Sequence, residues 1–187
     1  MKNYIKTLTT GLFALTFMIG FAVNVNAQVS DDDATVAVGA TVLAPLDVEQ
    51  RENLQFGFVA IGSTPIADAG TGDFTGVVPG LGTSIGKVTV ATNAGTEVTV
   101  TFDATRTLES DVDEATDLNF SSSVFFKEGF DSDESSGGDD VTTDGSHSYT
   151  VGTTGIDTFF LGGNLGTIPA GANGVYTGDV TFTAAFN

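Results

Sequence analysis

The chain has no cysteine and no tryptophan, and only one histidine and six basic residues among 187. Without cysteine no disulfide can staple the fold, and the lipid-modified cysteine of a bacterial lipoprotein is excluded. The six basic residues face 24 acidic ones, which gives a formal net charge of −18. Nucleic acids and anionic membranes select basic surfaces, so neither is expected as a partner. The fold must be held by its own core or by contacts with copies of itself.

Scarce histidine and absent cysteine also argue against a transition-metal site. A zinc site usually takes three or four His, Cys or carboxylate ligands, so we interpret His147 as a surface residue beside a strand start. Gly82–Gly86 matches the G-x-S-x-G pattern, and Asp144 and His147 follow in hydrolase order. However, a nucleophile elbow needs a strand before the serine and a helix after it. Here a Gly/Pro loop precedes Ser84 and a strand pattern follows, so we expect no hydrolase.

Paired carboxylates offer a second enzymatic reading, that of a glycosidase. A sugar cleft is usually lined with aromatic residues, yet tryptophan is absent and the phenylalanines fit the apolar faces of strands. We therefore expect a protein that is not an enzyme, with no catalytic and no cofactor-binding residues. The carboxylates considered for this role are Asp111, Asp113, Glu114 and Asp117.

Long apolar runs are missing apart from one near the N-terminus. Gly11–Val23 is uncharged, Lys2 and Lys6 precede it, and short residues lead to Ala27. This pattern predicts a secretory signal peptide over residues 1–27, because the apolar run falls short of the ~20 residues that cross a bilayer. We expect export through the Sec route to the periplasm, the cell surface or the medium. No membrane span is expected in the mature chain.

Residues 28–187 would then form the mature protein, which suits one domain with an adequate core. Loss of the two signal lysines leaves four basic and 24 acidic residues, a net charge of −20. Helix signals are nearly absent, and Thr, Val, Phe and Gly favour strands and tight turns. We expect seven to nine strands in an all-β, antiparallel, immunoglobulin-like Greek-key sandwich. A jelly roll or a small barrel is the alternative.

Alternation of apolar and polar residues marks the strands. Leu118–Phe126 is the clearest internal strand, and Phe74–Val78 reads as a weak edge strand. Lys87–Val90 and Val98–Phe102 flank a Gly-containing loop, which predicts a hairpin. A further piece places Leu54, Phe56 and Phe58 on one face. The terminal stretch Gly174–Asn187 predicts a half-buried strand with Tyr176, Gly178, Val180, Phe182, Ala184 and Phe186 facing the core.

Thr35–Val42 also alternates, with Val36, Val38, Ala40 and Val42 on one face. We expect this strand to be the piece through which subunits join, if they join at all. Pairing within its own domain is the favoured arrangement, because only six residues, 28–33, precede it. Addition to the sheet edge of a neighbouring subunit is the alternative.

The acidic residues concentrate in the middle of the chain, with an acidic loop near residues 128–146. Oxygen ligands at alternate positions suit calcium, but Ser136 and Thr142 stand where an EF-hand loop needs Gly and Glu. A solvated loop is the favoured interpretation, and a calcium site is the alternative. The residues that would form that site are Asp131, Asp133, Glu134, Asp139 and Asp140.

Several short motifs resemble an exported bacterial family called domain of unknown function family 4402. They are Ala44–Leu46 followed by Asn53–Gly57, then Gly162–Leu165 with Ile168–Gly171, and finally Gly174–Gly178 with its strand to Asn187. The resemblance implies an export signal and a fimbrial-subunit-like sandwich without assigned catalytic residues. The terminal strand with Phe186 next to last also resembles pilins of the chaperone–usher type. A long donor extension and a disulfide, common in those pilins, are absent.

Together these features predict a non-catalytic exported surface protein, a fimbria-like structural or assembly subunit. Copies of itself or other surface subunits, joined by strand addition, would be its partners. A secreted binding module for carbohydrate or calcium is the alternative function.

Overall fold

The structure is a computed structural model that describes residues 40, 42–78, 81–130 and 136–187. The chain divides into two units, residues 1–41 and residues 42–187, and the fold below is that of the second. The signal peptide predicted over residues 1–27 lies outside the described residues. So does the predicted strand Thr35–Val42, apart from Ala40 and Val42.

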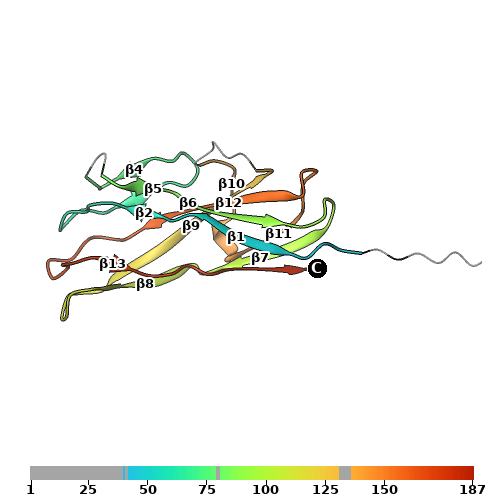
Figure 1. The fold of residues 1–187 in the computed structure, drawn as a ribbon. Coiled ribbons are helices and arrows are strands. Elements are labelled where there is room, and N and C mark those ends of the chain that lie inside the picture. Colours follow the sequence, from blue (N-terminus) through green and yellow to red (C-terminus); the bar gives the residue numbers. More distant parts are fainter. Residues whose placement is uncertain (1–39, 41, 79–80, 131–135) are drawn as a thin grey trace, which may run out of the picture. The chain divides into compact units, whose positions relative to one another are not determined.

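Antiparallel strands build residues 42–187, which confirms the predicted all-β class (Figure 1). The longer sheet has the order β1 (Asp47–Glu52), β6 (Gly86–Ala91), β12 (Ile156–Asn164), β9 (Leu118–Glu128), β8 (Thr105–Ser110) and β13 (Tyr176–Thr177). Three short strands are attached to it, namely β3 (Ile66–Ala67) on β12, β4 (Phe74–Thr75) on β3, and β10 (Asp139–Asp140) on β9.

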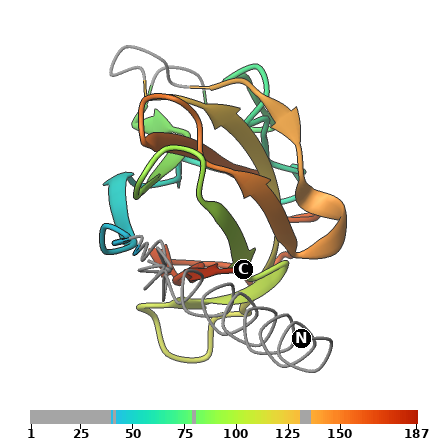
Figure 2. The same ribbon diagram turned by 90° about the vertical axis from the view of Figure 1, so that its right-hand side faces the viewer.

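A second sheet has the order β11 (Ser146–Thr150), β7 (Glu97–Phe102) and β14 (Phe182–Phe186), and β2 (Gln55–Phe56) pairs with β5 (Thr83–Ser84). Figure 2 views the strands end-on and shows the strong curl of the longer sheet. One 3₁₀ turn, Thr142–Asp144, is the helical element of the described residues. In the same part of the chain, no helix is long and apolar enough to cross a membrane.

One apolar core joins the two larger sheets, and β9 shows how the sequence produces it. Its even-numbered residues from Leu118 to Phe126 are buried while the alternate ones are more exposed, as the period-two pattern predicts. The residues that β9, β6, β12 and β7 contribute to this core are Leu118, Phe120, Val124, Phe126, Val88, Val90, Phe159, Leu161, Val98, Val100 and Phe102.

The predicted hairpin of Lys87–Val90 and Val98–Phe102 is wrong. The two segments form β6 and β7, which lie in different sheets and do not pair with each other. β6 pairs with β1 and β12, whereas β7 pairs with β11 and β14. Local sequence marks a turn here, but the burial of nearly all of β6 favours a central place between two other strands.

The loop after β6 is instead an arch that crosses between the sheets, and a second arch from β11 to β12 lies against it. Gly95 N–H donates to Val151 O at 2.9 Å, and Val151 N–H donates to Thr96 O at 2.9 Å. Thr92 N–H donates to Gly155 O at 3.0 Å. These bonds satisfy the backbone groups of both arches and couple the two sheets at this end.

A second correction concerns Phe58, which was predicted to share a core face with Leu54 and Phe56. Leu54 and Phe56 do pack against the core, but the side chain of Phe58 is 66% exposed. Gly57 stands between them with φ +67, a left-handed conformation that interrupts the alternation of an extended strand. A Cβ at Gly57 would also overlap the carbonyl of Leu81.

The predicted terminal strand is divided into β13 and β14. β13 pairs with β8 in the longer sheet, and β14 pairs with β7 in the shorter one. The predicted inward face is otherwise confirmed, because Tyr176, Val180, Phe182 and Ala184 all pack against the core. Phe186 departs from this pattern and is 42% exposed.

Close packing of β3 on β12 depends on Gly162 near the C-terminal end of β12. A Cβ at this position would overlap the backbone carbonyl of Ala67 and lie 2.8 Å from the backbone nitrogen of Ala69. Both alanines are fully buried. A glycine is therefore required where the short strand pairs with the long one.

Candidate functional site

The sequence predicts five calcium ligands in the acidic loop near residues 128–146, and the structure describes two of them. Asp139 and Asp140 form β10, pair with Phe126 and Phe125 of β9, and are exposed. Neighbouring residues of a strand point to opposite faces, so these two carboxylates do not converge on one point. The other three residues, Asp131, Asp133 and Glu134, lie outside the described residues.

Asp140 is tied to the turn that follows it. Its Oδ1 accepts a hydrogen bond from Thr142 N–H at 2.9 Å. Hydrogen bonds from the side chain and then from the backbone of Thr142 lower the pKa of the Asp140 carboxyl. Across the described ranges, no three His, Cys, Asp or Glu side chains are grouped as metal ligands. The described geometry therefore assigns Asp140 a turn-stabilising contact.

His147 lies on β11 and belongs to a stack of rings between β11 and the longer sheet. Its ring centroid is 4.6 Å from that of Phe126 and 5.5 Å from that of Tyr149, on which it stacks with nearly parallel planes. Burial lowers the pKa of His147, while the charge of Asp139 acts in the opposite direction. We expected His147 to be a surface residue. Its ring is instead half-buried and packs against the neighbouring rings.

Two polar groups in this region are buried, the carboxylate of Asp157 and the hydroxyl of Tyr149. Asp157 is fully buried, and its two carboxylate oxygens accept hydrogen bonds from Gly129 N–H at 2.7 Å and Gly152 N–H at 3.1 Å. The hydroxyl of Tyr149 is buried and has no hydrogen-bond partner in the described part of the chain. Burial first, and the Asp157 charge second, raise the pKa of Tyr149. Asp157 thereby joins the end of β9 to the β11–β12 arch.

The residues weighed for hydrolysis occupy separate structural positions. Ser84 lies on β5, donates its hydroxyl hydrogen to Asn53 O at 2.6 Å, and is followed by strand β6. His147 lies on β11 in the three-stranded sheet, whereas β5 pairs only with β2 among the described strands. Asp111 Oδ1 accepts a hydrogen bond from Val175 N–H at 2.7 Å, and Glu114 adopts a left-handed turn conformation with φ 63. These contacts give the loop carboxylates local structural roles.

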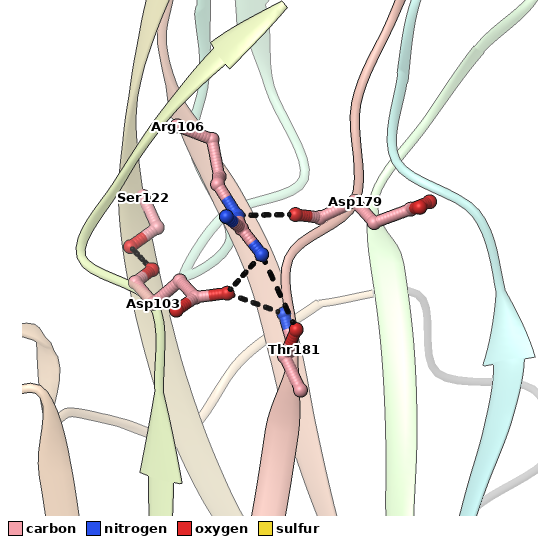
Figure 3. A network of polar contacts seen from close by, with 5 residues as sticks. All are labelled: Asp103, Arg106, Ser122, Asp179 and Thr181. Carbon is pink, nitrogen blue, oxygen red and sulfur yellow. Dashed lines mark hydrogen bonds and ion pairs between the residues drawn. The ribbon is translucent and has the colours of Figure 1, made fainter.

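A polar clamp holds the terminal segment where it crosses from β13 to β14 (Figure 3). Asp103 follows β7, and its Oδ2 accepts a hydrogen bond from Thr181 N–H at 2.9 Å and lies 3.1 Å from Nη2 of Arg106. The Nε of Arg106 donates to Asp179 O at 2.7 Å. The side chain of Asp179 points away from this network in Figure 3.

Backbone donation explains the electrostatics of the clamp. The hydrogen bond from Thr181 N–H is the main cause that lowers the pKa of Asp103, and the charge of Arg106 lowers it further. Ser122 on β9 donates to Asp103 O at 2.8 Å. The clamp therefore joins β7, β8, β9 and the terminal segment.

Edge strands are the features that strand addition would use. β1 pairs with β6 and β14 pairs with β7, each being the last strand of its sheet among the described residues. All six side chains of β1 are exposed, and four of them are charged. Charged exposed edges disfavour pairing with another chain. The described part of β1 is therefore an edge protected against strand addition.

An exposed apolar cluster, which we call the apolar tip, was not predicted. Val59 and Val77 form an antiparallel bridge, and Val78 N–H donates to Phe58 O at 2.8 Å. Opposed side chains in such a pair share a face, so Phe58 and Val78 point outward together. We define the tip as the exposed apolar residues of the two segments that this bridge joins, namely Phe58, Ile61, Val78 and Leu81, with exposures of 66%, 60%, 41% and 48%. The positive φ of Gly57 is the feature that exposes Phe58, and sequence alternation does not reveal it.

No protein-family model matches the chain, and no curated protein matches it. The resemblance to domain of unknown function family 4402 therefore stays a prediction from the motifs.

Proposed function

We propose that the chain is a non-catalytic exported surface protein that acts as a fimbria-like structural or assembly subunit. The apolar tip is the observation that supports this proposal most directly. Large grouped apolar side chains are unusual on a soluble monomer and commonly mark surfaces where proteins join. In a chain with 24 acidic and six basic residues, such a surface is more readily explained by assembly than by solubility.

Two further features suit a subunit that bears load instead of performing chemistry. The terminal segment is fastened to three strands by the Asp103–Arg106 clamp. The polar side chains weighed for catalysis make local bonds to turns and strand ends. Hydrogen bonding of this kind stabilises a framework.

Microscopy of the cells that produce the protein is the direct test. Cells should carry fibres or a surface layer that gold-labelled antibody against the chain decorates, and cells lacking the gene should not. N-terminal sequencing of the surface fraction should begin at Gln28. A protein that stays in the cytoplasm with Met1 retained would refute the proposal.

Calcium binding at the acidic loop is the second candidate function. Asp139 and Asp140 are exposed, and three further acidic residues lie near them in the sequence. A bound ion should raise the melting temperature in millimolar calcium above that in sodium chloride of equal ionic strength. Ligand at ten times its Kd adds ~1.4 kcal/mol to the free energy of unfolding. Equal melting temperatures in the two salts would show that calcium acts only by screening the negative charges and that no site is present.

A further inference from the structure

The apolar tip and the start of the described unit lie at opposite ends of the same pair of strands. Val42 is 86% exposed, and its carbonyl accepts a hydrogen bond from the side-chain amide of Asn93, just beyond β6. The tip follows β2 and precedes β5 at the other end. β1 and β2 run antiparallel to β5 and β6, from the pair Asp47–Ala91 to the pair Phe56–Thr83.

Phe56 stands nine positions after Asp47, so the distance between these two residues is roughly 30 Å at ~3.3 Å per residue. We call Thr35–Val42 the N-terminal arm. Val38 and Val36 stand four and six positions before Val42. Even a fully extended chain therefore places them at most ~14 Å and ~22 Å from Val42. The arm of one molecule therefore cannot place these valines on its own tip, whereas the arm of another molecule can.

The distribution of charged residues also favours contact between the arm of one copy and the tip of another. The sequence from Ala34 to Leu46 contains no charged residue, and neither does Asn53–Ala67 nor Phe74–Gly86, the two segments that supply the tip. Copies of a chain with so large an excess of acidic residues repel one another across most of their surfaces. Two copies therefore meet the least electrostatic repulsion where they approach through uncharged apolar segments.

We propose that the N-terminal arm of one copy binds the apolar tip of the next copy, so that the protein assembles head to tail. Val36, Val38 and Val42 cover Phe58, Ile61, Val78 and Leu81 of the neighbour. The contact is heterologous, since different surfaces meet, and a heterologous contact that does not close into a ring yields an open filament. This inference rests on the proposed function and specifies its partner as a second copy.

Complementation between two variants tests the pairing. One variant alters the tip, Phe58→Ser with Leu81→Ser, and the other alters the arm, Val36→Asp with Val38→Asp, both in the exported protein with its native N-terminus. The wild type should form species that grow with concentration in sedimentation velocity. Each variant alone should be monomeric, and their equimolar mixture should give a dimer that grows no further. Val175→Ser, which removes an equally exposed apolar side chain outside the tip, should assemble like the wild type.

A labelled peptide of Ala34–Leu43 adds a readout that does not depend on polymer formation. It should bind the arm variant, and binding should weaken at least tenfold when the tip substitutions are added. Circular dichroism and melting curves should show that all variants are folded. A monomeric mixture, a tip variant that polymerises, or equal peptide binding with and without the tip would overturn the proposal. So would an arm variant that melts far below the wild type, because the arm would then belong to its own domain.

The two levels of the proposal can fail separately. Surface fibres that persist with the tip variant would leave the structural function standing and refute the head-to-tail contact. Arm-to-tip complementation in solution without any fibres or surface layer on cells would refute the proposed function.

Discussion

The carboxylate of Asp103 accepts a hydrogen bond at 2.9 Å from the backbone N–H of Thr181, 78 positions later in the chain. Replacing Asp103 by Ala should lower the free energy of unfolding by about 1–2 kcal/mol, the value of a hydrogen bond to a charged group that is partly exposed to solvent. Chemical denaturation followed by circular dichroism measures the change. Asp179→Asn also removes one negative charge beside the clamp, but its side chain points away from the network in Figure 3, so it should change stability by less than about 0.5 kcal/mol.

The contribution of Asp103 should also depend on pH. Its pKa is lower in the folded state than in the unfolded chain, so its stabilisation is complete above about pH 4 and is lost as the pH falls through the folded value. The difference in melting temperature between the wild type and Asp103→Asn should therefore shrink below about pH 4. A difference that stays constant from pH 6 to pH 3 would show that the carboxylate charge is not the cause.

His147 should respond in a higher range of pH. Burial lowers its pKa in the folded state, so protonation favours unfolding, and its effect appears as the pH falls through the unfolded value of about 6.5. His147→Phe keeps a ring in the stack with Phe126 and Tyr149 but cannot titrate. Relative to this variant, the wild type should lose melting temperature between pH 7.5 and pH 5.5. Parallel curves for the two proteins would contradict the assignment.

Substitution of Asp157 should be more severe than that of any exposed acid. Asp157→Ala leaves the N–H groups of Gly129 and Gly152 without their carboxylate acceptors, and a buried unsatisfied group costs about 1–3 kcal/mol. We expect a loss of about 2–4 kcal/mol in urea unfolding. Asp139→Asn, on the exposed strand β10, is the control and should be nearly neutral. Faster amide exchange confined to the β11–β12 arch would identify the region released.

A methyl group at Gly162 should disrupt the contact of β3 with β12. Gly162→Ala places Cβ against the buried backbone of Ala67 and Ala69, so we expect a loss of about 3 kcal/mol, at the upper end of overpacking effects. Gly82→Ala meets open space and changes only the backbone preference at a positive φ, with a cost of about 1 kcal/mol. Equal thermal unfolding of these two variants would show that β3 adapts to the methyl group.

Prediction from sequence succeeded where the pattern is local. β9 and the inward residues of the terminal segment follow from alternation, because each strand must bury one face. Pairing is decided between distant segments, which alternation does not encode. For that reason β6 and β7 were expected to form a hairpin, although each finds its partners elsewhere in the chain.

The candidate sites show the same limit. Position 57 reads as an ordinary residue of an extended piece until its φ is known, and that angle turns Phe58 outward. Similarly, alternation places Tyr176 and Phe182 on one face. The segment between these two residues crosses from one sheet to the other where Asp103 and Arg106 bind it. Neither effect is contained in composition or period.

The ladder between β1 and β6 has a mechanical consequence. Its hydrogen bonds lie across the strand direction, and β1 leads from Val42 at one end toward the apolar tip at the other. Tension that enters at Val42, before β1, and leaves at Leu81, before β5 and β6, therefore pulls the two paired strands in opposite directions and shears the whole ladder at once. Rupture then requires several bonds to break together, so this strand pair should resist pulling along its length far better than pulling across it.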